Sequence, residues 1–366
     1  MTPAEGPTTA VGHRSPHGLL PMRGRDPGEQ GRAGSPLELI FDLIAVVAVS
    51  IASSNLARLL DEGHIVTGIG TFLFAVFAIT WAWSTYSQLL SAFDTDDWGV
   101  RLITLMQMVG VLLLALGLGP MVASIDSGGL DNKVMVLGYV VMRVGAIIVW
   151  LRVARVSGRY RVMATAYVRA LVISQVGWCL QAFLPIPPRI ALTVMGVWLV
   201  QEVLYPVLAE RRQQMPWHPE HMAERLGAFT IITLGEVVLG TVTAVQADVD
   251  GFGWNATAIA VAVAGLGLAF GLWWLYFILP CGELLGLRPR RLHAVILLHI
   301  LLYASIAAVG AGLHLSASFV EGSRAPPGSL WRWPSRSPRP RWCCSPSPTS
   351  PPCSAGLTPS MACCWR

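Results

Sequence analysis

The sequence has few charged residues and almost no lysine. Asp, Glu, Lys and Arg make up 13% of the 366 residues, whereas apolar residues make up 54%. A soluble domain usually carries about 25% charged residues, because its surface must stay hydrated. Lys133 is the only lysine, and the arginines lie in short segments between apolar runs. The composition therefore predicts a membrane protein, and it argues against nucleic acid as a partner.

Motifs of soluble enzymes are also missing. The chain has no Walker loop, no G-x-S-x-G, no H-E-x-x-H and no C-x-x-C. We therefore expect no catalytic residues, no metal site and no cofactor, although an intramembrane enzyme that uses acidic residues stays open as an alternative. Residues 1–36 are rich in Pro, Gly and Arg and lack the apolar core of a secretory signal. This stretch predicts a disordered cytoplasmic tail.

Long apolar runs recur along the rest of the chain. A helix needs about 20 apolar residues to cross a bilayer, and inside lipid every backbone N–H and C=O must be bonded within its own helix. Nine runs are long enough: about 37–60, 66–90, 101–124, 133–153, 165–184, 189–209, 223–246, 253–280 and 292–315. The sequence thus predicts an all-α integral membrane protein, a polytopic bundle of about nine transmembrane helices in 37–315, with the lipid bilayer as its surroundings.

The arginines predict the orientation. If the N-terminus is inside, fifteen arginines fall in the inner segments 1–36, 91–101, 152–161, 210–225 and 281–291. The outer loops then hold only Arg58, Lys133 and Arg189. This asymmetry agrees with the positive-inside rule and predicts a cytoplasmic N-terminus.

Charged side chains interrupt several of the predicted spans. A charge inside the bilayer costs a few kcal/mol, so such residues face the protein interior and usually pair. Glu38 and Asp42 are four residues apart and share a helix face. Arg225 and Glu236 share a face of a later helix, three turns apart. The full set of candidate pathway or ion-site residues is Glu38, Asp42, Arg143, Glu202, Glu224, Arg225, Glu236 and His299.

Two interpretations of this set stay open. It can line a polar pathway that opens toward the cytoplasm, or Arg143 and Arg225 can neutralise the carboxylates in fixed pairs that lock the bundle. An acidic loop carries a second candidate set, Asp94, Asp96, Asp97 and Arg101, for which ordinary helix capping is the alternative. Glycines are expected to allow close helix packing at Gly235, Gly240, Gly265, Gly267 and Gly271.

Residues 322–366 differ in composition from everything before them. They contain no Asp, Glu, Lys, Val, Ile or Phe, and they hold five of the seven cysteines. A metal-binding or disulfide-bonded tail and a disordered Ser/Pro-rich tail are two interpretations. We favour a third, an out-of-frame translation, because Trp-Arg-Trp-Pro at 331–334 is Leu-Ala-Leu-Ala in the neighbouring frame of G+C-rich codons.

Matching features also predict that the helices repeat as two parallel copies of six, as in some transporters. Aromatic clusters end the predicted helices 66–90 and 253–280, and Arg-Leu opens the predicted helices at Arg101 and Arg291. Glu38 and Glu224 begin the first and seventh helices. Two such copies imply twelve helices, within a range of ten to twelve expected for an intact protein.

Several stretches resemble the bacterial low temperature requirement A protein family. They are E-L-I-F-D-L at 38–43, W-A-W at 81–83, F-D-T-D-D-W-G-V-R-L at 93–102, H-M-A-E-R-L-G-A-F-T-I-I-T-L-G-E at 221–236, W-W-L-Y-F at 273–277 and H-I-L-L-Y-A-S-I-A-A-V-G-A-G-L at 299–313. The resemblance covers about 37–315 and stops at Gly322. It implies a multi-pass protein of the bacterial inner membrane, without an established reaction or substrate.

These observations lead to one functional expectation and its rivals. We expect a transporter or channel that moves an ion, a proton or a small solute through a pathway lined by the buried charges. A non-transporting membrane scaffold, or an intramembrane enzyme that acts on lipid, is the alternative.

Overall fold

The computed structural model describes residues 19–26, 34–126, 129–211 and 213–322, and every regular element in these ranges is helical. The elements are α1 (Pro36–Asp61), α2 (Ile65–Phe93), α3 (Trp98–Leu116), α4 (Leu118–Asp126), α5 (Lys133–Val156), α6 (Arg161–Phe183), α7 (Pro188–Ala209), α8 (Pro219–Phe252), α9 (Ala256–Phe277), α10 (Cys281–Leu287), η1 (Pro289–Arg291) and α11 (Leu292–Gly322). Within the described residues, nine helices are long and apolar enough to cross a membrane. The predicted fold class is therefore confirmed.

Local sequence signals set several helix ends. Ser35 and Glu38 form a capping box at the start of α1, with Pro36 in the first turn. Asp97 and Asn255 cap α3 and α9 by accepting hydrogen bonds from the backbone N–H groups three residues ahead. Gly253 ends α8 with a φ of 68°, a conformation that favours glycine.

The helices differ from the predicted spans in three places. The run predicted at 101–124 is divided at Gly117 into α3 and α4. The loop predicted at 281–291 contains α10 and η1. Helix α8 has 34 residues and starts at Pro219, before Arg225. Arg225 is buried within this helix, so it is not one of the loop arginines that indicate the orientation in the membrane.

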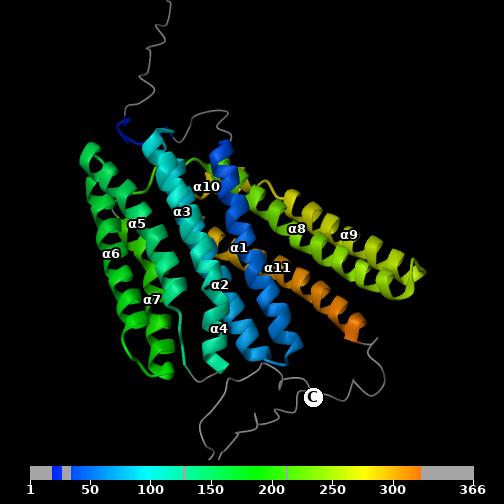
Figure 1. Cartoon of the computed structure of the whole chain (residues 1–366). Coiled ribbons are helices and arrows are strands. Elements are labelled where there is room, and N and C mark those ends of the chain that lie inside the picture. The colour runs from blue at the N-terminus through cyan, green and yellow to red at the C-terminus, as the bar shows by residue number, and fades with distance from the viewer. Residues whose placement is uncertain (1–18, 27–33, 127–128, 212, 323–366) are drawn as a thin grey trace, which may run out of the picture. The chain divides into compact units, whose positions relative to one another are not determined.

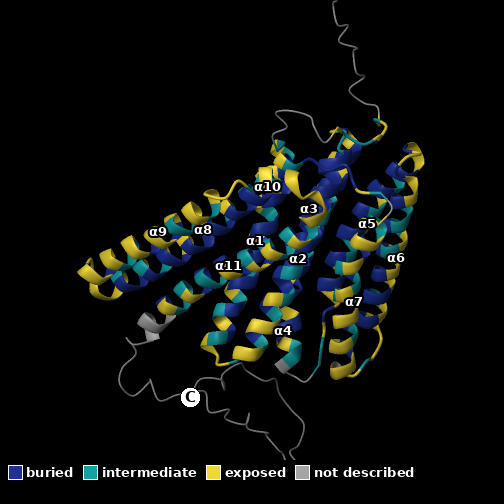
Figure 2. Ribbon diagram, turned by 180° about the vertical axis from the view of Figure 1, so that it is seen from behind, coloured by how far each residue is buried: buried dark blue, intermediate teal, exposed yellow. Residues whose placement is uncertain are grey.

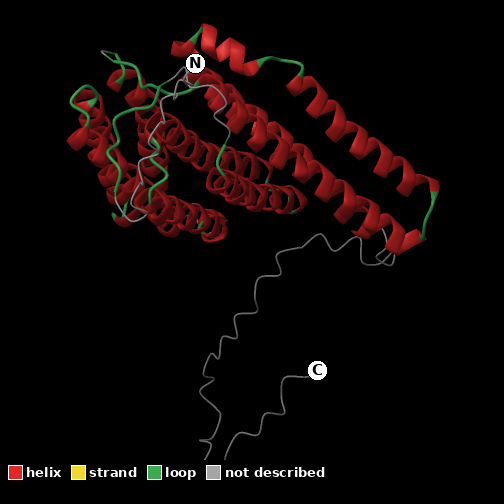
Figure 3. Ribbon diagram, turned by 90° about the horizontal axis from the view of Figure 1, so that it is seen from above, coloured by secondary structure: helices red, strands yellow, loops and turns green. Residues whose placement is uncertain are grey.

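Helix packing follows two similar patterns. Figure 1 shows α5, α6 and α7 along one side of the described bundle and the α8–α9 pair on the other side. Helix α1 packs against both α2 and α3, and α8 packs against both α9 and α11, as two copies of one three-helix unit would. Seen from above in Figure 3, α8 and α9 run side by side along much of their length. The parallel repeat stays a prediction that this arrangement supports.

Burial separates inner helices from peripheral ones (Figure 2). In the most apolar 18-residue stretch of each candidate span, 17% of the residues are buried for α9 and 22% for α7, against 44–56% for the other seven spans. Exposed apolar side chains such as Val263 and Leu275 on α9 suit contact with lipid rather than water. These two helices therefore lie at the edge of the described bundle.

Small residues allow some helices to approach closely. A Cβ on Gly240 would lie 2.7 Å from the carbonyl oxygen of Gly310, and one on Gly265 would lie 2.2 Å from Oγ1 of Thr241. The close packing predicted at Gly240 and Gly265 is confirmed. The prediction of close packing is wrong for Gly235, Gly267 and Gly271, where a Cβ would meet no atom within 4 Å. These three glycines lie on outward helix faces.

The structure differs from the predicted N-terminal tail over residues 19–26. Met22 is 1% exposed, and the Arg25 N–H donates to the carbonyl oxygen of Ala92 at 2.8 Å. This short segment therefore packs on the bundle at the junction of α2 and α3. Residues 34–36 of the predicted tail lead into the start of α1. Residues 1–18 and 27–33 of that tail, and residues 323–366 of the altered C-terminal segment, fall outside the described residues.

Candidate functional site

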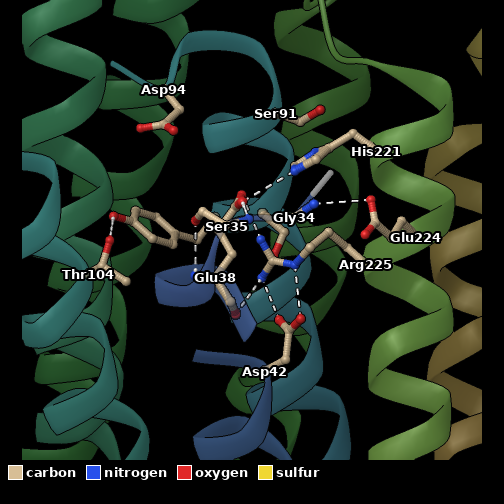
Figure 4. Close-up of polar contacts among 12 residues, drawn as sticks. Gly34, Ser35, Glu38, Asp42, Ser91, Asp94, Thr104, His221, Glu224 and Arg225 are labelled. Atoms are coloured by element: carbon tan, nitrogen blue, oxygen red, sulfur yellow. Dashed lines mark hydrogen bonds and ion pairs between the residues drawn. The ribbon is translucent and has the colours of Figure 1, made fainter. Parts of the chain in front are cut away.

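Four ionisable side chains meet between α1 and α8, and we call them the α1–α8 charge cluster: Glu38, Asp42, His221 and Arg225. Glu38 and Asp42 lie one turn apart on α1, and His221 and Arg225 lie one turn apart on α8. Figure 4 shows Arg225 reaching from α8 toward both carboxylates. The exposed fraction of these four side chains is 0–4%.

Arg225 joins the two carboxylates. Its Nη1 lies 2.8 Å from Oε1 of Glu38, its Nε donates to Oδ2 of Asp42 at 3.0 Å, and its Nη2 donates to Oδ1 of Asp42. The indole Nε1 of Trp83, on α2, donates to the same Asp42 Oδ1 at 2.6 Å. Asp42 is thus held by three donors, which fix its orientation.

Glu38 connects the helix start to the histidine. Its Oε2 accepts from the Ser35 N–H at 2.9 Å and lies 3.3 Å from Nε2 of His221. The Nδ1 of His221 is buried and has no hydrogen-bond partner among the described residues. His221 therefore contacts the cluster through one ring nitrogen only.

A second buried pair lies between α5 and α7. Nη2 of Arg143 lies 2.8 Å from Oε2 of Glu202, and both side chains are at most 2% exposed. Arg143 also donates to Oγ1 of Thr85 at 2.8 Å, while Glu202 accepts from Ser174 Oγ at 2.5 Å. One positive and one negative charge balance here, so this pair is neutral without further ions.

The remaining predicted pathway residues lie apart from both sites. Glu236 accepts a hydrogen bond from Ser50 Oγ on α1, which places Glu236 on the same face of α8 as Arg225, as the spacing predicts. His299 contacts the Tyr276 hydroxyl at 3.1 Å. Glu224 accepts from the Gly34 N–H at 3.1 Å near the start of α1 (Figure 4).

The acidic loop is a helix start that also binds the N-terminal segment. Asp97 accepts from the N–H groups of Val100 at 3.0 Å and Leu20 at 3.1 Å, and its Oδ2 lies 2.5 Å from Nη2 of Arg152. Arg101 pairs with Asp96 at 3.0 Å on the surface. The Asp94 carboxylate accepts from the Asp96 N–H at 2.8 Å. The capping interpretation of this loop therefore applies to Asp97.

Acid is expected to weaken the contact at Asp97. Burial raises the pKa of Asp97, but the hydrogen bonds from Arg152, Val100, Thr95 and Leu20 outweigh it and lower the pKa from 3.8 to about 2. A lowered pKa contributes stability that is complete above the unfolded value and is lost as the pH falls through the folded value. We expect Asp97→Asn to lower the melting temperature at neutral pH and to flatten its decline below about pH 4.

Melting curves followed by tryptophan fluorescence in one detergent would measure this effect. Asp96→Asn is the matched control, because Asp96 is 62% exposed in its pair with Arg101. An acid limb that is the same in Asp97→Asn and the unchanged protein would contradict the assignment.

Some contributing residues escaped the sequence analysis. His221 and Trp83 stand in stretches that resemble the family, but nothing in the sequence pairs them with Glu38 and Asp42. Their signals were the spacing of four residues between His221 and Arg225, and the placement of Trp83 in the aromatic cluster near the end of an apolar run. Thr85, Ser174 and Arg152 carry no comparable signal, because their roles depend on which helices become neighbours.

The charges thus form separate groups rather than one continuous row. In the described part of the chain, no three His, Cys, Asp or Glu side chains are arranged to hold a metal ion. The α1–α8 charge cluster holds the largest number of buried ionisable groups of these sites.

Comparison with known proteins gives one family and one relative. A family model described as bacterial low temperature requirement A protein matches residues 33–332. An uncharacterized protein of Rhizobium meliloti (strain 1021) is 26% identical over 260 residues, which are 68% of this chain and 59% of that relative. The chain therefore spans less than two thirds of the relative's length. No solved structure matches the chain.

Proposed function

This chain belongs to the bacterial low temperature requirement A protein family, and from that premise we propose that it is a transporter driven by a proton or another monovalent cation. The α1–α8 charge cluster is the site that binds this cation. The transported species is the cation itself or a small solute coupled to it. On this proposal the protein moves its substrate without chemical change and is not an enzyme.

The charge balance of the cluster carries the proposal. Glu38 and Asp42 supply two negative charges and Arg225 supplies one positive charge. Arg225 contacts both carboxylates, and the three side chains are at most 4% exposed. A net charge inside a membrane protein is costly. One proton or one monovalent cation makes the cluster neutral, and His221, 3.3 Å from Glu38, is placed to share it.

Two polar contacts between α1 and α8 define two successive binding positions for the cation along α8. Ser50 and Glu236 meet on the same pair of helices, three turns beyond the Asp42–Arg225 contact. The two contacts are separated by about 16 Å along α8, at about 1.5 Å per residue. Protonation of a carboxylate in the cluster weakens its attraction to Arg225 and frees α8 to shift against α1. We propose Glu236 as the second binding step.

The proposed membrane is the bacterial inner membrane, with the N-terminus in the cytoplasm. The arginines between the predicted spans support this orientation, because all but a few lie at the end of the bundle where α1 begins. In this orientation the cluster faces the cytoplasm.

Proton flux into liposomes tests the proposal. The full chain is reconstituted into liposomes that contain a pH-sensitive dye. A potassium gradient, with valinomycin added, sets the membrane potential. We expect an inward flux that Asp42→Asn abolishes, because the variant leaves Arg225 balanced by Glu38 alone and needs no further cation. Asp96→Asn on the surface is the control and keeps the flux. Monodisperse elution in detergent shows that the variants fold.

A non-transporting scaffold is the second candidate. The observation that favours it is the Arg143–Glu202 pair, whose charges balance and whose 2.8 Å contact locks α5 to α7. If neither the unchanged protein nor Glu236→Gln shows flux of protons, sodium or potassium, the scaffold replaces the transporter.

A further inference from the structure

A polar cavity lies where α7 ends and α11 begins, away from the α1–α8 charge cluster. Its volume is about 630 Å³. Arg159, Arg211 and Arg290 lie in its wall, together with Glu210 and His293. Arg159 follows α5, Arg211 follows α7 and Arg290 lies within η1, so three separate connections bring basic side chains to one place.

The arginines of this cavity are free to bind an anion. Within the described residues, no carboxylate pairs with Arg159, Arg211 or Arg290, whereas Arg143, Arg152 and Arg225 each have an acidic partner. The one acidic residue in the cavity wall, Glu210, already accepts a hydrogen bond from the Tyr167 hydroxyl at 2.5 Å. Burial raises the pKa of Glu210, which favours its uncharged form.

A histidine adds an unused polar group to the wall. His293 is 15% exposed, and its Nε2 lies 4.0 Å from Oε1 of Glu210. That Nε2 is buried and has no hydrogen-bond partner among the described residues. A buried nitrogen without a partner is unfavourable, and an oxygen atom of a bound anion would supply the partner.

An apolar groove adjoins the basic cavity. It has a volume of about 690 Å³ and shares Arg159, Arg211 and Gln213 with the cavity. The groove continues over side chains of α6 and α7, among them Val162, Met163 and Leu208. Val162 is 66% exposed and Leu208 is 51% exposed. A ligand that fills both spaces has an anionic end and a hydrocarbon chain.

We propose that the cavity and groove bind an anionic phospholipid, with its phosphate among Arg159, Arg211 and Arg290 and one acyl chain between α6 and α7. Arginines bind phosphate oxygens through charge-assisted hydrogen bonds. Basic pockets between helices at the membrane surface are suited to anionic headgroups. The site lies at helix ends, where headgroups reside, and the proposal is independent of transport.

Lipid-dependent melting tests the proposal. The full chain is melted in mixed micelles that contain either phosphatidylglycerol or phosphatidylcholine, and half-saturating lipid concentrations are compared. We expect about a hundredfold preference for phosphatidylglycerol, since each of the three arginines near the anionic group contributes roughly a fivefold gain in affinity. Arg159→Gln combined with Arg290→Gln should remove most of the preference. Arg101→Gln, whose arginine is 61% exposed outside the cavity, should keep it.

Two water-soluble probes separate the lipid from its headgroup. Inorganic phosphate and glycerol phosphate carry the anion without an acyl chain, so neither should stabilise the protein at the concentrations at which phosphatidylglycerol acts. Equal stabilisation by either probe would overturn the lipid assignment, as would equal affinity for the two lipids. Equal melting of the double variant and the unchanged protein in phosphatidylcholine confirms that the variant is folded.

Discussion

Arg225→Ala is expected to destabilise the helical bundle by about 3–5 kcal/mol, the range for removing one partner of a buried ion pair. The substitution leaves Glu38 and Asp42 facing each other without the guanidinium that now lies 2.8 Å from Glu38. Neither carboxylate can turn to water, because their side chains are 4% and 0% exposed. The protein is expected to lose folded yield and to unfold at lower denaturant concentration in mild detergent.

Two further variants isolate the electrostatic part of this effect. Arg101→Ala breaks an exposed pair with Asp96 and is expected to change stability by at most about 1 kcal/mol. Arg225→Ala combined with Asp42→Asn removes one of the two stranded charges and should recover part of the loss. A double variant as unstable as the sum of both single variants would show that packing, rather than charge, explains the loss.

Gly138→Ala is expected to separate α3 from α5. A Cβ at this position would lie 2.3 Å from the Leu114 nitrogen and 2.6 Å from the Gly110 carbonyl oxygen. Both atoms belong to the backbone, so no side chain can rotate away. Overpacking of this kind costs about 1–3 kcal/mol when side chains can adjust, and we expect the upper end of that range. Thermal melting in detergent measures the loss.

Gly70→Ala on α2 is the matched control, since a Cβ there meets nothing within 4 Å. Alanine is a better helix former than glycine by about 1 kcal/mol in water, so this variant should melt at an unchanged or slightly higher temperature. If the Gly138→Ala variant melts at the same temperature as the Gly70→Ala variant, the close approach of α3 and α5 is contradicted.

The apolar runs predicted the nine spans because each must cover the bilayer by itself, whatever its neighbours are. The pairing of charges is different. Spacing placed Glu38 with Asp42, and Arg225 with Glu236, on shared faces, and both spacings hold in the structure. Spacing could not show that Arg225 faces Asp42 and that Glu236 faces Ser50, because that depends on how α1 and α8 meet.

Glycines show the same limit of prediction. Gly240 and Gly235 are equally visible in the sequence, yet only Gly240 lies against Gly310 of α11. Five residues separate the two, which turns their Cα atoms by about 140° around a helix of 3.6 residues per turn. Which of the two faces a neighbour follows from the helix packing, and no local pattern encodes it.

The length of α8 determines how deep the α1–α8 charge cluster lies. A helix of 34 residues is about 51 Å long, against about 30 Å of hydrocarbon. Tilt alone would have to exceed the usual limit of about 40° to accommodate that difference. At least one end of α8 therefore extends beyond the hydrocarbon, and His221 and Arg225 lie in the first two turns of this helix. Under the proposed transport function, with the start of α8 at the cytoplasmic surface, a proton crosses only a short barrier to reach Glu38, and the main resistance lies farther along α8, between Arg225 and Glu236.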